Sequence, residues 1–269
     1  MFIEPHKLEN QVLEYSGYHT AWYKKTYNYD KWIRQAFVLQ NNPVTYSRGR
    51  YIECLAYYVT GKLDHAMAIA QQEIGGNRNY LIIYTTCLFM TGQIEACLSA
   101  FDRHYHPSDD IIQNAKRYTI MASYALLIFD THKAIEYLNK IPPTDIPYIM
   151  DKIQEVQGII DLTPLRLEQV NRAALPLDLV KDVLQLSVKT MCEQGNYGFS
   201  LEFETYIPND VLYITFYCED LSLEDMSRLN EAWIEAMVEH DWQYDFNLVS
   251  RLSVNYRPSL VSEGQSHVN

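Results

Sequence analysis

The residues best suited to chemistry lie together in one short segment rich in acids and histidines. Asp102, His104, His106, Asp109 and Asp110 fall within nine positions. Imidazole nitrogens and carboxylate oxygens ligate zinc and manganese, so His104, His106 and Asp102 form a weak candidate metal site. A metal ion needs three or four converging ligands, whereas Ser108 suits the N-cap of a helix and Asp109 and Asp110 suit its first turn. We therefore favour a solvated loop and expect no bound metal or other cofactor.

Signatures of common enzyme classes are absent from the sequence. It contains no GxSxG, HExxH, Walker or GxGxxG pattern, and its ten glycines leave little material for phosphate-binding loops. None of the five cysteines forms a CxxC pair, and most lie within apolar patterns, so we expect buried, reduced thiols. These observations predict that the protein is not an enzyme.

A basic and aromatic segment lies near the amino terminus, where residues 8–40 predict a first helical hairpin, which we call the basic hairpin. Between residues 22 and 51, six Lys and Arg side chains are opposed by a single acid, Asp30, and Trp and Tyr are interleaved with them. In one interpretation the aromatic side chains stack on nucleic-acid bases while the Lys and Arg side chains contact phosphates. We favour the other interpretation, in which the aromatic side chains pack in the core and the charged side chains are solvated. Arg48 and Arg50 flank Gly49 at a helix start and could bind a carboxylate or phosphate. The candidate partner-binding residues here are Trp22, Tyr23, Trp32, Arg34, Arg48, Arg50 and Tyr57.

An acidic segment lies towards the other end of the chain. Residues 199–245 contain twelve Asp and Glu against one basic residue, Arg228, in a chain whose net charge is −12. Such a face could bind a basic partner protein, imitate nucleic acid or fold back on the basic hairpin, although a solvated helix face is the commonest cause of an acidic run. The candidate partner-binding residues here are Glu231, Glu235 and Glu239.

Composition limits the class of protein. At 269 residues, with 48% hydrophobic and 21% charged residues, the chain can bury a sizeable core. The overall negative charge makes nucleic acid an unlikely general partner. The longest apolar run falls well short of the roughly 20 residues that span a bilayer, so we expect no membrane partner. No basic region followed by an apolar stretch opens the chain, and we expect a cytoplasmic protein.

A repeated residue pattern in the middle of the chain predicts the helices that position the candidate residues. An aromatic or apolar residue four before a tight turn, and a small residue four or five after it, recur around Gly61, Gly92 and Phe129. The pattern predicts three hairpins of short antiparallel helices. Their expected helices cover residues 46–60 and 63–74, 79–90 and 94–104, and 111–128 and 131–140.

Residues 46–147 resemble degenerate tetratricopeptide repeats. In that family a small residue in each helix lets the two helices of a hairpin approach closely. The matching positions are Cys54, Thr85 and Ala122 in the first helices and Ala66, Cys97 and Ala134 in the second. The resemblance implies stacked hairpins whose groove presents a surface to another protein.

The sequence after residue 147 predicts three more helices and then a small second domain. Thr163 and Pro164 are expected to separate a helix over 148–160 from one over 165–175, and Pro176 to open another that ends at Gly195. Strands over 197–207, 211–217 and 246–254 and a helix over 222–240 predict a β-β-α-β unit in which the helix packs across an antiparallel sheet. Ser222 and Asp225 resemble a capping box that opens this helix. The predicted fold class is α+β, mainly α-helical hairpin repeats followed by this small domain. The predicted boundaries are 1–195, 196–258 and a disordered tail over 259–269.

These features favour a non-catalytic adaptor or chaperone-like scaffold that binds a protein with a basic surface. The acidic domain would add a docking surface or form a homodimer through an edge of its sheet. One alternative is an immunity-type inhibitor whose acidic face blocks a basic, nuclease-like target. Another is nucleic-acid contact through the basic hairpin.

Overall fold

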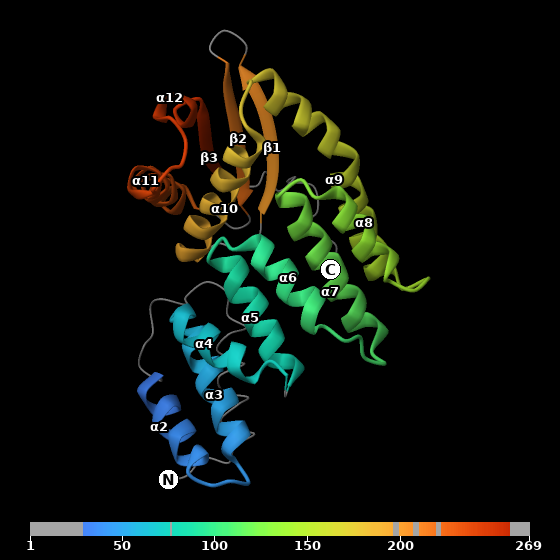
Figure 1. Ribbon diagram of the computed structural model, residues 1–269, viewed down its shortest axis with the longest axis vertical. Helices are drawn as coiled ribbons and strands as arrows, with labels where there is room; N and C mark the ends of the chain where they lie inside the picture. Colours follow the sequence, from blue (N-terminus) through green and yellow to red (C-terminus); the bar gives the residue numbers. More distant parts are fainter. Residues whose placement is uncertain (1–28, 76, 196–198, 207–209, 219–221, 259–269) are drawn as a thin grey trace, which may run out of the picture.

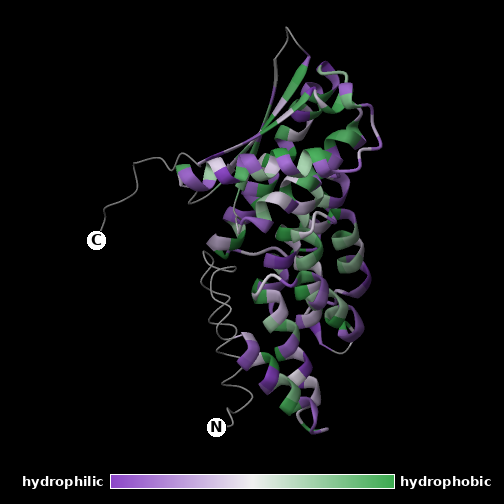
Figure 2. Ribbon diagram, turned by 90° about the vertical axis from the view of Figure 1, so that its left-hand side faces the viewer, coloured by the Kyte–Doolittle hydropathy of each residue, from purple (hydrophilic) through white to green (hydrophobic). Residues whose placement is uncertain are grey.

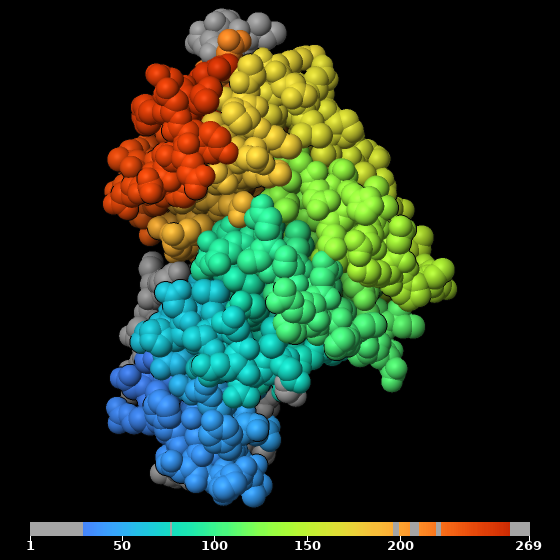
Figure 3. Space-filling view, in the orientation of Figure 1, coloured from blue at the N-terminus to red at the C-terminus, as the bar shows by residue number. Residues whose placement is uncertain are grey.

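The computed structural model describes residues 29–75, 77–195, 199–206, 210–218 and 222–258. The protein is mainly α-helical, with a small sheet near the carboxyl end, as the sequence predicts (Figure 1). Figure 3 shows an elongated molecule in which the blue residues of α2 (Tyr29–Gln40) form one end and the red residues, which include α11 (Leu223–Glu239), lie towards the other. Residues 8–28 of the predicted first hairpin, Trp22, Tyr23 and the tail 259–269 lie outside the described residues.

The three predicted hairpins are present with nearly the predicted bounds. Each packs two antiparallel helices against one another, and successive hairpins lie side by side. Their helices are α3 (Tyr46–Val59) with α4 (Leu63–Glu73), α5 (Arg78–Met90) with α6 (Ile94–His104), and α7 (Ile111–Leu127) with α8 (Thr131–Asn139).

The same backbone turn joins the two helices of every hairpin. Gly61, Gly92 and Phe129 all adopt positive φ, at 73°, 75° and 62°. Each is followed by a backbone N–H that reaches back to the carbonyl five residues earlier, a Schellman motif that satisfies the free carbonyls of the first helix. These bonds run from Lys62 to Tyr57 at 2.9 Å, from Gln93 to Leu88 at 2.8 Å and from Asp130 to Ala125 at 2.9 Å. The repeated residue pattern in the sequence therefore arises because the first helix of each hairpin ends in the same motif.

Helix α10 (Leu177–Glu193) covers the turn of the second hairpin. The Ile94 N–H donates to Gln185 Oε1 at 3.4 Å, and Gln185 Nε2 donates to Glu95 at 3.3 Å. A Cβ added at Gly92 would lie only 2.5 Å from the Gln185 carbonyl oxygen. Glycine is needed here both for positive φ and for this close approach.

One long helix replaces the two helices that were predicted on either side of Pro164. Helix α9 (Pro147–Arg172) continues through that proline, so the predicted break is wrong. Its first half packs on α7 through buried Ile149 and Val156, and Arg166 of its second half reaches the sheet. Packing along both halves outweighs the missing N–H and the steric penalty of an interior proline, which together cost about 3 kcal/mol.

We expect Pro164→Ala to stabilise the protein by about 1–2 kcal/mol, because alanine restores a helical N–H and removes the clash, although it also loosens the unfolded chain. Chemical denaturation measures the free energy of unfolding. Pro176→Ala is the matched control, since Pro176 is the N-cap of α10 and interrupts no helix. A loss of stability in Pro164→Ala would contradict this account.

The sheet has the order β1-β2-β3, with β1 (Phe199–Tyr206) antiparallel to β2 (Val211–Cys218) and β2 parallel to β3 (Leu252–Pro258). The predicted all-antiparallel sheet is therefore wrong. A connection that contains a helix returns the chain in its original direction, which pairs the two strands in parallel. The predicted strand over 246–254 is also misplaced, because Asp245 caps a short helix, α12 (Phe246–Val249), by accepting from the Asn247 N–H at 2.8 Å.

Helix α10, rather than α11, covers the buried face of the sheet. The Tyr256 hydroxyl donates to the Ser187 carbonyl of α10 at 3.0 Å, and Cys218 contacts Met191 at 3.7 Å. One apolar cluster extends from Leu81 in α5 through α10 to Tyr256 in β3. The division into domains at residues 195 and 196 stays a prediction, and this cluster continues across it.

Side chains occupy hydrogen-bonding groups on both edges of the sheet. Asn230 of α11 accepts from the Tyr256 N–H at 3.1 Å and donates to the Tyr256 carbonyl at 3.3 Å, as a neighbouring strand would. On the opposite edge, Arg166 donates to the Leu201 carbonyl at 2.8 Å. Such contacts discourage pairing with another chain. A homodimer through a sheet edge stays a prediction and would have to displace one of these side chains.

Candidate functional site

The amino-terminal candidates are mostly engaged within the fold. Trp32 is only 2% exposed and belongs to the core that α2, α3 and α4 share. Tyr57 is half-buried, with its ring centroid 5.9 Å from that of Tyr29 and 4.9 Å from that of His65. Arg34 and Arg48 are exposed. The structure therefore does not gather these candidates into one surface.

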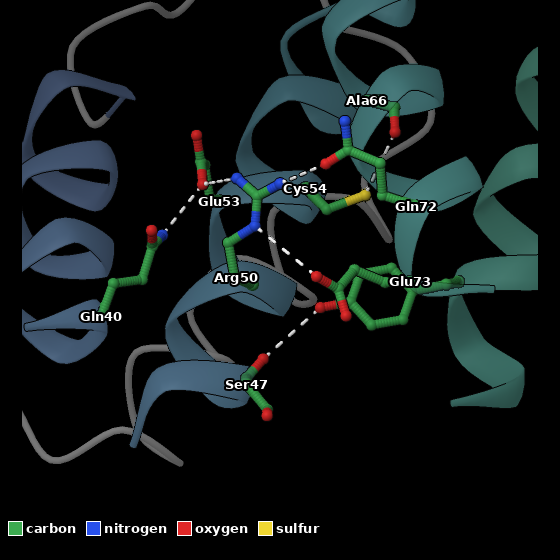
Figure 4. Close-up of polar contacts among 9 residues, drawn as sticks. Gln40, Ser47, Arg50, Glu53, Cys54, Ala66, Gln72 and Glu73 are labelled. Atoms are coloured by element: carbon green, nitrogen blue, oxygen red, sulfur yellow. Dashed lines mark hydrogen bonds and ion pairs between the residues drawn. The ribbon is translucent and has the colours of Figure 1, made fainter. Parts of the chain in front are cut away.

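Arg50 lies inside a polar network among the first helices (Figure 4). Its Nη1 lies 2.8 Å from Glu53 Oε2, and its Nη2 donates to Gln72 at 3.1 Å. Glu53 is buried, and it also accepts from Gln40 Nε2 of α2 at 2.9 Å. Glu73 of α4 adds a longer ion pair of 3.9 Å. The charge of Arg50 is thus offset within the protein, which weakens the interpretation of this residue as a phosphate contact.

The acidic and histidine-containing segment is a structured connection. Asp102 pairs with Lys133 Nζ at 2.6 Å and accepts from the Tyr137 hydroxyl at 2.9 Å. Asp110, rather than the expected Ser108, caps α7 by accepting from the Gln113 N–H at 3.0 Å. Within the described ranges, no three His, Cys, Asp or Glu side chains are arranged to hold a metal ion. His104, His106 and Asp102 therefore do not converge as a site.

The five cysteines are all free and buried, as expected. Burial raises the pKa of Cys54, Cys97 and Cys218 to about 12, and it also raises the pKa of Cys87 and Cys192. A thiol must lose its proton to act as a nucleophile. These cysteines stay protonated at neutral pH and serve as small apolar core residues.

The acidic candidates lie together on the outer face of α11. Ser222 caps this helix by accepting from the Asp225 N–H at 3.1 Å, which confirms the predicted capping interaction. Leu229 and Trp233 bury the inner face. The outward residues follow helical spacing, and we call them the α11 face: Glu231, Ile234, Glu235, Val238 and Glu239.

The α11 face combines negative charge with exposed apolar side chains. Ile234 is 62% exposed and Val238 is 74% exposed. No cation in the described part of the chain forms an ion pair with Glu231, Glu235 or Glu239. In Figure 2, which is viewed from the side on which α11 lies in Figure 1, hydrophilic and hydrophobic residues alternate on this helix. The sequence predicted its acids, but the two apolar residues between them were missed.

The structure also contains a hollow that the sequence did not predict. We call it the α7–α9 groove: it has a volume of about 470 Å³ and lies where α7, α9 and β1 meet, next to the end of α5. A smaller hollow of about 200 Å³ between α7 and α9 adjoins it and shares Ser123 and Glu155 with it. The residues that line the α7–α9 groove come from four segments that are distant in the sequence, so no local pattern could indicate this groove.

No protein-family model, curated protein or solved structure matches this chain. Among the described residues, every helix is too short or too polar to cross a bilayer.

Proposed function

We propose that the protein is a non-catalytic adaptor that binds a basic partner protein on the α11 face. The supporting observation is that Ile234 and Val238, both largely exposed, lie among three acids that form no ion pair with any cation in the described ranges. Residues four apart on a helix are neighbours, so Ile234 and Val238 form one apolar patch that a partner could cover. The mixture matches a partner helix or loop that carries apolar and basic side chains.

The two kinds of side chain would contribute differently to binding. Fully burying a side chain such as Ile or Val contributes about 1.5–3 kcal/mol, so Ile234 and Val238 would supply affinity. The carboxylates would accelerate the encounter with a basic partner, and salt would slow it. Cytoplasmic localisation is part of this proposal, as is membership of the tetratricopeptide-like class.

The helical hairpins form the scaffold in this proposal. Helix α9 packs on α7, and helix α10 packs on α5. The carboxyl-terminal unit is therefore held against the hairpins, and α11 lies on the flank of this unit, beside β3 (Figure 1). A rigid support limits the conformational entropy that binding must remove.

Charge reversal on α11 tests the proposal. Affinity capture from native lysate with the wild-type chain should recover a stoichiometric basic protein. Glu231→Lys, Glu235→Lys and Glu239→Lys combined should reduce its recovery at least tenfold, and higher salt should reduce recovery by the wild type.

Reversing three acids outside α11 tests whether binding depends on the charge of the α11 face or on the net charge of the protein. Asp145, Asp151 and Asp161 lie in or beside α9 and are exposed. Changing all three to Lys alters the net charge by the same amount and should leave recovery unchanged. Equal recovery by the two triple variants would refute docking on the α11 face.

A further inference from the structure

The α7–α9 groove is an apolar hollow with one cation. Its volume of about 470 Å³ falls within the range of small-molecule sites. Phe89, Leu126, Leu127, Ile159 and Leu162 supply much of its wall. Arg166 is the only Lys or Arg among the described residues that line it.

Two contacts hold Arg166 in place. Its Nη2 donates to the Leu201 carbonyl of β1 at 2.8 Å, and its Cζ lies 5.4 Å from the centroid of the Phe203 ring. Phe203 is itself packed edge-on against Phe129, at a centroid distance of 5.7 Å. A guanidinium has five N–H donors, so the contact with Leu201 leaves further donors for a ligand.

No carboxylate in the described part of the chain forms an ion pair with Arg166. Burial lowers the pKa of its guanidinium from the usual value, and no neighbouring charge offsets that effect. Removing a cation from water is unfavourable unless an anion compensates for it. Glu155, the other charged residue in the wall, pairs with Lys152 at 2.6 Å. The uncompensated charge in the groove is therefore positive.

We propose that the α7–α9 groove binds an apolar monocarboxylate. The ligand carboxylate accepts charge-assisted hydrogen bonds from Arg166, and its hydrocarbon body lies against Leu126, Ile159 and Leu162. A peptide strand fits the groove less well, because Arg166 already occupies the Leu201 carbonyl and an apolar wall offers few partners for peptide amides. This site shares no residue with the α11 face, so each proposal can fail without the other.

Calorimetric titration with decanoate and decanol, both below the concentrations at which they aggregate, tests the proposal. The two probes share a hydrocarbon chain and differ in charge. The wild-type chain should bind decanoate at least tenfold more tightly than decanol. Arg166→Met should bind the two probes with equal affinity, and Arg166→Lys should keep part of the preference.

A second arginine of the same helix provides the control. Arg172 is exposed and paired with Glu168, so Arg172→Met should keep the full preference for decanoate. Leu162→Trp should fill the groove and weaken binding of both probes, and thermal unfolding would verify that each variant folds. Equal affinities in the wild type, no binding of either probe, or a preference that persists in Arg166→Met would overturn the proposal. If Arg166→Met does not fold, the proposal is tested by the relative affinities of the wild-type chain for decanoate and decanol and by the loss of binding in Leu162→Trp.

Discussion

Replacing Glu53 by Leu is expected to destabilise the protein by about 3 kcal/mol. Glu53 is 5% exposed, and it is the closest charge partner of half-buried Arg50, at 2.8 Å. Leucine fills a similar volume but leaves the guanidinium without that carboxylate, and an uncompensated buried charge typically costs 3–5 kcal/mol. Gln40 also loses the acceptor that joins α2 to α3. Equilibrium denaturation measures the change.

The double variant Arg50→Met with Glu53→Leu separates charge from packing. Replacing both partners with apolar residues removes the buried charges together, so its stability should lie within about 1 kcal/mol of the wild type. A double variant that is as unstable as Glu53→Leu alone would show that the pair is not the origin of the loss.

Gly92→Ala is expected to destabilise the protein by about 2–4 kcal/mol. A residue with a Cβ costs roughly 1–2 kcal/mol in the left-handed region, and Gly92 has φ of 75°. The new Cβ would also lie 2.5 Å from the Gln185 backbone oxygen, so α10 must move away from the second hairpin. Overpacking of this kind adds about 1–3 kcal/mol.

Gly195→Ala is the matched control for backbone strain. Gly195 has φ of 83°, yet no heavy atom lies within 4 Å of an added Cβ. This variant should therefore lose only the strain energy, about 1–2 kcal/mol. Equal losses in Gly92→Ala and Gly195→Ala would indicate that α10 does not dock closely on the turn.

Local chemistry allowed much of the fold to be predicted. Helix α6 has the predicted bounds because Gly92 and the residues around it determine where one helix ends and the next begins. The cap of α11 at Ser222 was likewise predictable from residues within one turn. Helix endings depend on neighbours a few positions apart, which the sequence displays directly.

Features that depend on distant packing were not predicted. Pro164 carries a local signal to break a helix, but contacts of α9 with α7 and β1 override it. Arg50 is predicted as a binding residue because it flanks Gly49 at a helix start, but its contacts with Gln72 and Glu73 of α4 come from the tertiary fold. The α7–α9 groove, in which Arg166 meets Leu201 across 35 positions, depends wholly on the tertiary fold. The acids on α11 were predicted, whereas the exposure of Ile234 and Val238 required the structure.

Side-chain oxidative footprinting of the chain with its captured basic partner tests the central claim most directly. Binding on the α11 face should slow the oxidation of Ile234 and Val238 several-fold. Tyr148 and Leu165 of α9, which are 50% and 52% exposed, should react at the same rate with and without the partner. Protection of the α9 residues with unchanged oxidation of Ile234 and Val238 would contradict the claim and place the partner elsewhere.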